Sequence, residues 1–145
     1  MTGVELARRA VACPGWRWLP GMGMREGALV VSCADGIPTE VVFDGVLVPA
    51  VVVHDGIAPG PWYDLDGALP DLDDPATLGC LLALVREAWG SHVSSIRTGD
   101  GWSVRHMGRD GWAVGLSVVG ITQCATEAEA LVVALEAAPR REAAP

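Results

Sequence analysis

The chain has 145 residues, of which 50% are hydrophobic and 19% charged, so it can bury a sizeable core and is not intrinsically disordered. Its net charge of −8 is uneven, because residues 26 to 85 hold ten acidic residues and no Arg. That stretch carries −10, and the remainder therefore carries +2. Nucleic acid attracts basic surfaces, so general nucleic-acid binding is not expected.

The N-terminus (MTGVELARRA) lacks the apolar stretch of a secretory signal. The most apolar run, residues 41 to 53 (VVFDGVLVPAVVV), is interrupted by Asp44, Gly45 and Pro49 and is too short to cross a bilayer. We therefore expect a cytoplasmic protein that makes no contact with a membrane.

The four cysteines are scattered, with no Cys-x-x-Cys pair. They are Cys13, Cys33, Cys80 and Cys124. In a reducing compartment, this arrangement indicates buried small hydrophobic side chains rather than disulfides or metal ligands. We expect them to contribute to the core.

The first predicted element is a helix over residues 4 to 12 (VELARRAVA), because its apolar residues recur at helical spacing. Pro14 and Gly15 end this helix, and residues 16 to 24 (WRWLPGMGM) follow as an aromatic loop or short strand. Residues 28 to 32 (ALVVS) form the next predicted strand.

The apolar run over residues 41 to 53 has two interpretations. It is either a hairpin that turns at Asp44-Gly45 or one long strand interrupted there. An Asp-Gly pair between apolar runs is a strong signal for a hairpin. Residues 55 to 73 are rich in Gly, Pro and Asp, which indicates a long loop.

The clearest helix runs from Pro75 to Trp89 and ends at Gly90. Asp74 is its predicted N-cap, and a proline at the first helical position strengthens that assignment. Its apolar residues form a continuous stripe along one face. They are Leu78, Leu81, Leu82, Val85 and Trp89.

Three short strands are predicted next, separated by Gly-Asp turns at 99 to 101 and 108 to 111. Their residues are 93 to 98 (VSSIRT), 102 to 107 (WSVRHM) and 112 to 119 (WAVGLSVV). This spacing is typical of an antiparallel meander. The last helix begins at Thr126, with Glu129 completing a capping box.

These elements predict an α+β fold in which an antiparallel sheet of about five strands, including the C-terminal meander, is packed by three helices. We expect a single-domain sandwich over residues 1 to 138, because no linker is long enough to separate two domains. Residues 139 to 145 (PRREAAP) are expected to form a flexible tail.

Five aspartates lie in residues 62 to 75 (WYDLDGALPDLDDP), directly before the central helix. The spacing does not fit an EF-hand loop, which needs Gly at position six and Glu at position twelve. Carboxylates gather before a helix because its N-terminus carries partial positive charge. We therefore interpret this segment as the entrance to the helix. A divalent-ion site at Asp64, Asp66 and Asp73, and an acidic protein-binding patch, remain as alternatives.

The segment from Arg97 to Trp112 is the one neighbourhood suited to an anionic ligand, because Trp stacks on bases and Arg binds phosphate. The predicted ligand-binding residues are Trp102, Arg105, His106, Arg109 and Trp112. If residues 102 to 107 form a strand, Trp102 and His106 share one face and Arg105 lies on the other. The alternative is that Trp102 and Trp112 pair across strands in the core. Trp16, Arg17 and Trp18 form a second aromatic group.

Common catalytic patterns are absent from the sequence, which has no GxSxG, P-loop, HExxH or GxGxxG. His54, His92 and His106 are isolated and lie at no metal-ligand spacing from another His or Cys. We therefore assign no catalytic residue, expect no cofactor, and consider a non-enzymatic protein the better interpretation.

Three segments resemble the phage ABA-sandwich domain proteins, small proteins encoded by phages and prophages. They are residues 5 to 18 (ELARRAVACPGWRW), 70 to 89 (PDLDDPATLGCLLALVREAW) and 125 to 137 (ATEAEALVVALEA). They look like the opening, central and C-terminal helices of that family. The resemblance implies a phage or prophage accessory protein in the cytoplasm of a bacterial host, and it carries over no catalytic residue.

The expected function is therefore binding, which would antagonise host defence by sequestering a small anionic, nucleotide-like ligand or by binding a host protein. Three alternatives remain open. One is a metal-dependent hydrolase that uses Asp64, Asp66, Asp71 or Asp73 with His54. Another is a structural homo-oligomer built through the edge of the meander. The last is an acidic mimic of nucleic acid that uses residues 26 to 85 to capture a basic host protein.

Overall fold

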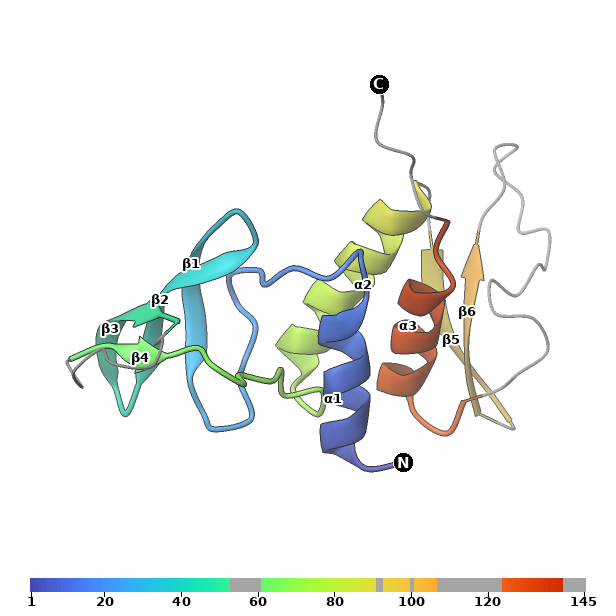
Figure 1. Cartoon of the computed structure of the whole chain (residues 1–145). Coiled ribbons are helices and arrows are strands. Elements are labelled where there is room, and N and C mark those ends of the chain that lie inside the picture. Colours follow the sequence, from blue (N-terminus) through green and yellow to red (C-terminus); the bar gives the residue numbers. More distant parts are fainter. Residues whose placement is uncertain (53–60, 91–92, 100, 107–123, 140–145) are drawn as a thin grey trace, which may run out of the picture. The chain divides into compact units, whose positions relative to one another are not determined.

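The structure is a computed structural model that describes the whole chain except residues 53–60, 91–92, 100, 107–123 and 140–145 (Figure 1). It divides into two compact units. We call Met1–Trp16 with Leu81–Pro145 the terminal unit, and Arg17–Cys80 the central unit. The α+β class with three helices is confirmed. Each unit is described by itself, and the single domain stays a prediction.

In the terminal unit, helices α1 (Gly3–Ala12) and α3 (Glu127–Glu136) begin at threonine caps. Thr2 and Glu5 form a complete capping box at α1, which the sequence analysis did not identify. At α3, the Thr126 hydroxyl accepts the Glu129 N–H at 3.1 Å, which confirms Thr126 as the cap and is one of the two hydrogen bonds of the predicted capping box. α3 is the most enclosed helix, because both faces contribute buried residues. These are Ala128, Ala130, Leu131, Val132, Ala134 and Leu135.

Helix α2 (Pro75–Trp89) begins and ends where the sequence predicts, and the boundary between the units falls within it. The Asp74 carboxylate accepts the Thr77 N–H at 3.0 Å, so it is the N-cap. Gly90 ends the helix at a φ of 66°, a left-handed conformation that suits glycine. No helix among the described residues is long and apolar enough to cross a membrane.

Strands β5 (Val93–Thr98) and β6 (Gly101–His106) form an antiparallel hairpin in the terminal unit. Trp102 pairs with Cys124 through backbone hydrogen bonds of 2.8 and 2.9 Å, so the chain returns to the outer edge of β6. The third predicted strand, residues 112 to 119, lies outside the described residues, and so does most of the predicted tail. The hairpin packs against α3, where the Ser95 hydroxyl donates to Glu127 at 2.6 Å.

The central unit holds β1 (Leu29–Ala34), β2 (Ile37–Phe43), β3 (Val46–Val51) and the two-residue β4 (Tyr63–Asp64), in that order across the sheet. The predicted hairpin at Asp44-Gly45 is confirmed, and the single long strand was wrong. A second Asp-Gly turn, at Asp35-Gly36, joins β1 to β2. Both turns have positive φ at Asp (52° and 51°) and Gly (75°), as type I′ hairpins require.

The sheets differ in arrangement from the one antiparallel sheet that the sequence suggests. The described strands form two sheets, one of four strands and one of two. β4 runs parallel to β3, with Ala50 opposite Tyr63, inside the segment expected to be only loop. A two-residue strand has no hydrophobic period of its own, so the sequence pattern could not reveal it.

The segment before β1 is fixed to the start of α2. The Gly23 N–H donates to the Thr77 hydroxyl at 2.8 Å, and the Gly23 carbonyl accepts the Asp71 N–H at 2.8 Å. Thr77 is fully buried and its hydroxyl also donates to Asp74 at 2.8 Å. A side chain at Gly23 would place its Cβ 3.4 Å from the Asp74 carboxylate. The acidic segment is therefore built into the packing of this unit.

Candidate binding surfaces

The predicted ligand-binding residues on β6 do not share one face of the hairpin. Trp102 lies opposite Arg97 in the register, and Val104 opposite Ser95. Val104 is fully buried, so this face is the one that packs inward, and Trp102 on it is half-buried. Arg105 is exposed and belongs to the other face. The alternation predicted for the strand is therefore present, and it separates the aromatic ring from the guanidinium.

The structure does not describe the side chains of the other three predicted ligand-binding residues. Arg109 and Trp112 lie outside the described residues, and so does the side chain of His106, which stands opposite Val93 in the register. On the face of Arg105 the register places Ser94 directly across and Ser103 two residues earlier on β6. The five-residue site stays a prediction. Ser94, Ser103 and Ile96, which pairs with Ser103, share this face with Arg105, and none of them was predicted as a site residue.

The second aromatic group is partly structural. Trp16 and Trp18 are half-buried and Arg17 is exposed. In the central unit the Trp18 N–H donates to the Gly36 carbonyl at 2.9 Å. A Cβ at Gly36 would lie 2.7 Å from the Arg17 Cβ, so this segment runs closely along the β1–β2 turn.

Two of the aspartates proposed as metal ligands, Asp64 and Asp71, accept hydrogen bonds from the backbone. Asp64 accepts the Asp66 N–H at 2.9 Å and Asp71 accepts the Asp73 N–H at 3.1 Å, which are turns of the Asx type. Asp74 caps α2. Within the described part of the chain, no group of three or more His, Cys, Asp and Glu residues is placed to hold a metal ion. His54, the fifth residue of that alternative, lies outside the described residues.

Tyr63 and Glu26 form a hydrogen-bonded pair of ionisable groups in the central unit. The Tyr63 hydroxyl donates to Glu26 at 2.8 Å, which ties β4 to the turn before β1. Burial, and then the hydrogen bond to Glu26, raise the pKa of Tyr63 to about 12. The phenol is therefore a permanent donor at neutral pH. Its ring also lies 5.4 Å from that of Phe43, in a tilted arrangement.

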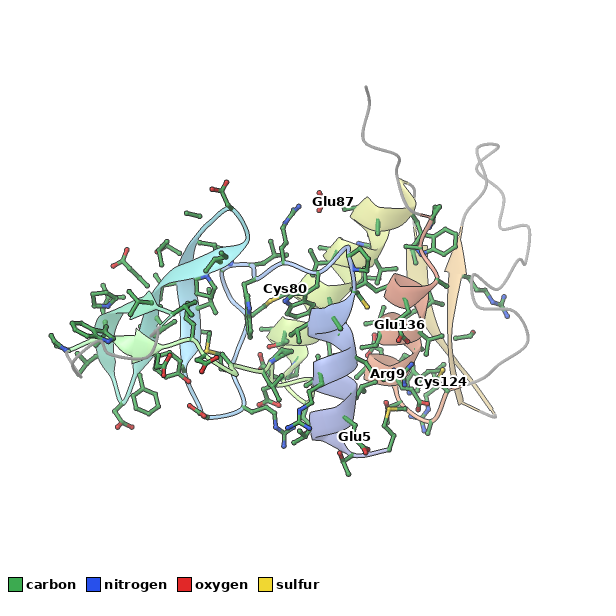
Figure 2. The ribbon with its side chains drawn as sticks, in the orientation of Figure 1. Glu5, Arg9, Cys80, Glu87, Cys124 and Glu136 are labelled. Carbon is green, nitrogen blue, oxygen red and sulfur yellow. The ribbon has the colours of Figure 1, made fainter. Side chains whose placement is uncertain are left out.

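In the terminal unit, Arg9 of α1 and Glu136 of α3 lie side by side (Figure 2). Two guanidinium nitrogens reach the two carboxylate oxygens, with Nε to Oε2 at 3.2 Å, and the hydrogen bond raises the pKa of Arg9. Burial raises the pKa of Cys13 and of Cys124 in this unit, so both thiols stay protonated. The contact between Arg9 and Glu136 therefore joins α1 to α3.

The central sheet also carries an apolar face that was not predicted from the sequence. Among the residues that the structure describes, the exposed large hydrophobic side chains other than Met1 all belong to this unit. They are Leu29, Val31, Ile37, Val46, Leu47, Val51 and Val52, each between 39% and 58% exposed. The register aligns Leu29, Val42 and Leu47 in one row across β1, β2 and β3. Residues in register share a face.

We call this surface the open face and define it by Leu29, Val42, Leu47, Pro49 and Val51. The opposite face carries the row of Val30, Val41 and Val48. Val30 and Val41 are 1% and 0% exposed, so that side is the core. Antiparallel sheets with one face in water normally alternate apolar and polar residues. The sequence contains a signal for this face, because the apolar residues of the run from 41 to 53 fall on both faces of the strands.

The surroundings of the open face are acidic. Glu40 lies on the face beside the apolar row, opposite Pro49 in the register. Asp35 and Asp44 occupy the turns at the ends of the strands. Residues 17 to 80 contain ten acidic residues and two Arg, which gives −8, the whole net charge of the chain. The terminal unit has eight of each sign.

Comparison of the chain with protein-family models, with curated proteins and with solved structures finds no match in any of the three.

Proposed function

We propose that the chain is a binding protein that holds a partner protein against the open face of the β1–β3 sheet. The observation that carries this proposal is the row formed by Leu29, Val42 and Leu47, with Leu29 and Leu47 exposed at 44% and 55%. Contiguous apolar patches on a protein surface mark interaction sites more often than chance.

The physical reason is the cost of apolar surface in water. Burying apolar area gains roughly 25 cal/mol for each Å², so several half-exposed Leu and Val side chains offer a useful binding free energy. The core beneath does not depend on them, since Val30 and Val41 on the other face are already fully packed. The open face is therefore available to a partner without a change in the fold.

The resemblance to phage ABA-sandwich proteins supports a further part of the proposal. The partner is a protein of a bacterial host, and binding interferes with host defence. No catalytic residue and no cofactor enter this proposal. A structural homo-oligomer is the alternative in which the same face meets a second copy.

The test is affinity capture from a bacterial lysate with two matched variants. Leu47→Thr removes apolar area from the open face. Val46→Thr is the control, because Val46 is equally accessible at 58% exposure but pairs with Phe43 on the opposite face of the sheet. We expect one partner to be retained by the wild type and by Val46→Thr and lost by Leu47→Thr. Equal capture by all three proteins would contradict the proposal.

A second candidate function is the capture of a small anion on the outer face of the β5–β6 hairpin. The observation that favours it is the register that places Ser94 and Ser103 beside the exposed Arg105. Two hydroxyl donors and a guanidinium suit a phosphate group. Native mass spectrometry after exposure to lysate tests it. An added mass lost in Arg105→Ala and kept in Arg97→Ala, on the opposite face, is the expected result, and a clean mass contradicts it.

A further inference from the structure

The charge around the open face restricts what can cover it. The central unit carries −8, with Glu40 on the face itself and Asp35 and Asp44 at its turns. The central unit has only two arginines, Arg17 and Arg25, and neither belongs to β1, β2 or β3. A partner with acidic flanks would be repelled, whereas basic flanks would be attracted to Glu40 and Asp44 on the two sides of the apolar row.

A second copy of this chain is a poor occupant for the same reason. A symmetric dimer through the open face would bring two identical acidic surrounds together, and like charges in contact cost several kcal/mol. The apolar centre alone would favour such a dimer, so the charge decides between the two occupants.

The edges of the sheet argue against a partner that adds a strand. Along the first half of β1, the segment before it already pairs, with Gly21 and Met22 hydrogen-bonded to Val30 at 2.9 Å each. At the other edge, β4 pairs with the end of β3, and Pro49 has no N–H to donate. What remains accessible is the face, and an apolar sheet face is normally covered by a helix or a second sheet.

We infer that the open face binds a basic amphipathic helix of another protein, with its apolar side on Leu29, Val42 and Leu47 and its Lys or Arg residues toward Glu40 and Asp44. This inference rests on the proposed function and adds the chemistry of the partner. A helix lying across three strands fits the row, because the row itself crosses the strands.

The experiment uses designed peptides as probes. A labelled amphipathic peptide of Leu and Lys, about 18 residues or five helical turns long, is titrated with the full chain and followed by fluorescence anisotropy. Matched peptides replace Lys with Glu, or Leu with Ser. The protein variants are Leu47→Thr, Leu29→Thr in the same row, and Val46→Thr as the control. Asp44→Asn tests the charge, because Asn tolerates the positive φ at this turn.

We expect the wild type to bind the Leu–Lys peptide, with at least about tenfold weaker binding for Leu47→Thr or Leu29→Thr and less than about twofold for Val46→Thr. The Leu–Glu and Ser–Lys peptides should bind far more weakly. Salt and Asp44→Asn should weaken binding of the Leu–Lys peptide, because both reduce the attraction between exposed charges. The second row variant keeps the test decisive if Leu47→Thr fails to fold.

Other outcomes separate the inference from the proposed function. If the Leu–Lys and Leu–Glu peptides bind equally and both depend on Leu47, the face docks proteins but the basic partner is wrong. If no Leu peptide depends on Leu47, both are wrong. A mass that rises with concentration and falls in Leu47→Thr, measured by analytical ultracentrifugation, would show that a second copy is the occupant. A much lower Tm for Leu47→Thr than for Val46→Thr would show that the face is packed within the chain, and would overturn both.

Discussion

The terminal and central units differ in how far they bury their apolar side chains. In the terminal unit, α3 is buried on several sides and its leucines reach 0% and 2% exposure. In the central unit, one face of the sheet is packed as tightly, and the other keeps a row of Leu and Val in water. The charges divide in the same way, with none net in the terminal unit and −8 in the central one. In the described residues, the terminal unit therefore offers a buried helix, and the central unit offers an exposed apolar face.

The largest expected effect contrasts two leucines, one from each unit. Leu131→Ala in α3 should lower the free energy of unfolding by about 2–5 kcal/mol, because the side chain is fully buried and leaves a cavity. Leu47→Ala on the open face should change it by less than about 1 kcal/mol, since Leu47 is 55% exposed. Urea unfolding followed by circular dichroism measures both. Similar losses for the two variants would break the contrast between a packed core and a free face.

Two glycines sharpen the contrast within the central unit, where tight turns fix the strands. Gly36 and Gly45 share a φ of 75°, so alanine at either costs about 1–2 kcal/mol of backbone strain. At Gly36 the new Cβ would also lie 2.7 Å from the Arg17 Cβ, whereas at Gly45 nothing lies within 4 Å. We expect Gly36→Ala to lower the Tm clearly more than Gly45→Ala in a thermal melt. Equal shifts would mean that the Arg17 segment moves away freely.

The helix caps test whether the acidic entrance of α2 is structural. Asp74→Ala removes two hydrogen bonds to Thr77, whose hydroxyl also receives the Gly23 N–H, so we expect a loss of about 1–2 kcal/mol. Thr126→Ala in the terminal unit removes the single bond to the Glu129 N–H and should cost about 1 kcal/mol or less. Denaturant titration of both variants checks this order. The reverse order would indicate that Asp74 serves another purpose.

The smallest expected effect concerns Tyr63, the only tyrosine in the chain, and it is observed only at high pH. Its pKa is raised to about 12 by burial and by Glu26, so it is protonated at pH 7 in both the folded and unfolded protein. Because the folded pKa lies above the unfolded value of about 10, this contribution to stability is complete below pH 10 and is lost as the pH rises toward 12. Absorbance near 295 nm follows the titration. Glu26→Gln should lower the midpoint while leaving it above 10, and an unshifted wild-type midpoint would contradict the contact.

Local signals in the sequence predict the ends of the elements well. The Asp74-Pro75 start of α2, the Thr126 cap of α3 and the Asp44-Gly45 hairpin all depend on one or two residues with strong backbone preferences, and the structure confirms them. The same kinds of signal, overlooked in the sequence analysis, mark the Thr2–Glu5 capping box and the Asp35-Gly36 turn. These features were predictable in full.

Long-range features were not predictable in the same way. The alternation along β6 predicts that Trp102 and Arg105 face opposite sides, but only the packing of Val104 shows which side is inward. The open face is harder still, because a run that is apolar in both phases is also typical of a strand buried on both sides. Pairing of β3 with β4 joins residues that lie far apart in the sequence, Ala50 with Tyr63 and Val51 with Asp64, and no local pattern encodes it.

The edges of the central sheet affect whether copies of the protein can aggregate. Exposed apolar strands are a template for fibril growth when their edges can accept another strand. Here the pairing before β1, the short β4 and Pro49 cover part of each edge, and the net charge of −8 opposes the approach of a second copy. We therefore expect fibril growth through this sheet to be disfavoured, while the open face stays exposed to a partner.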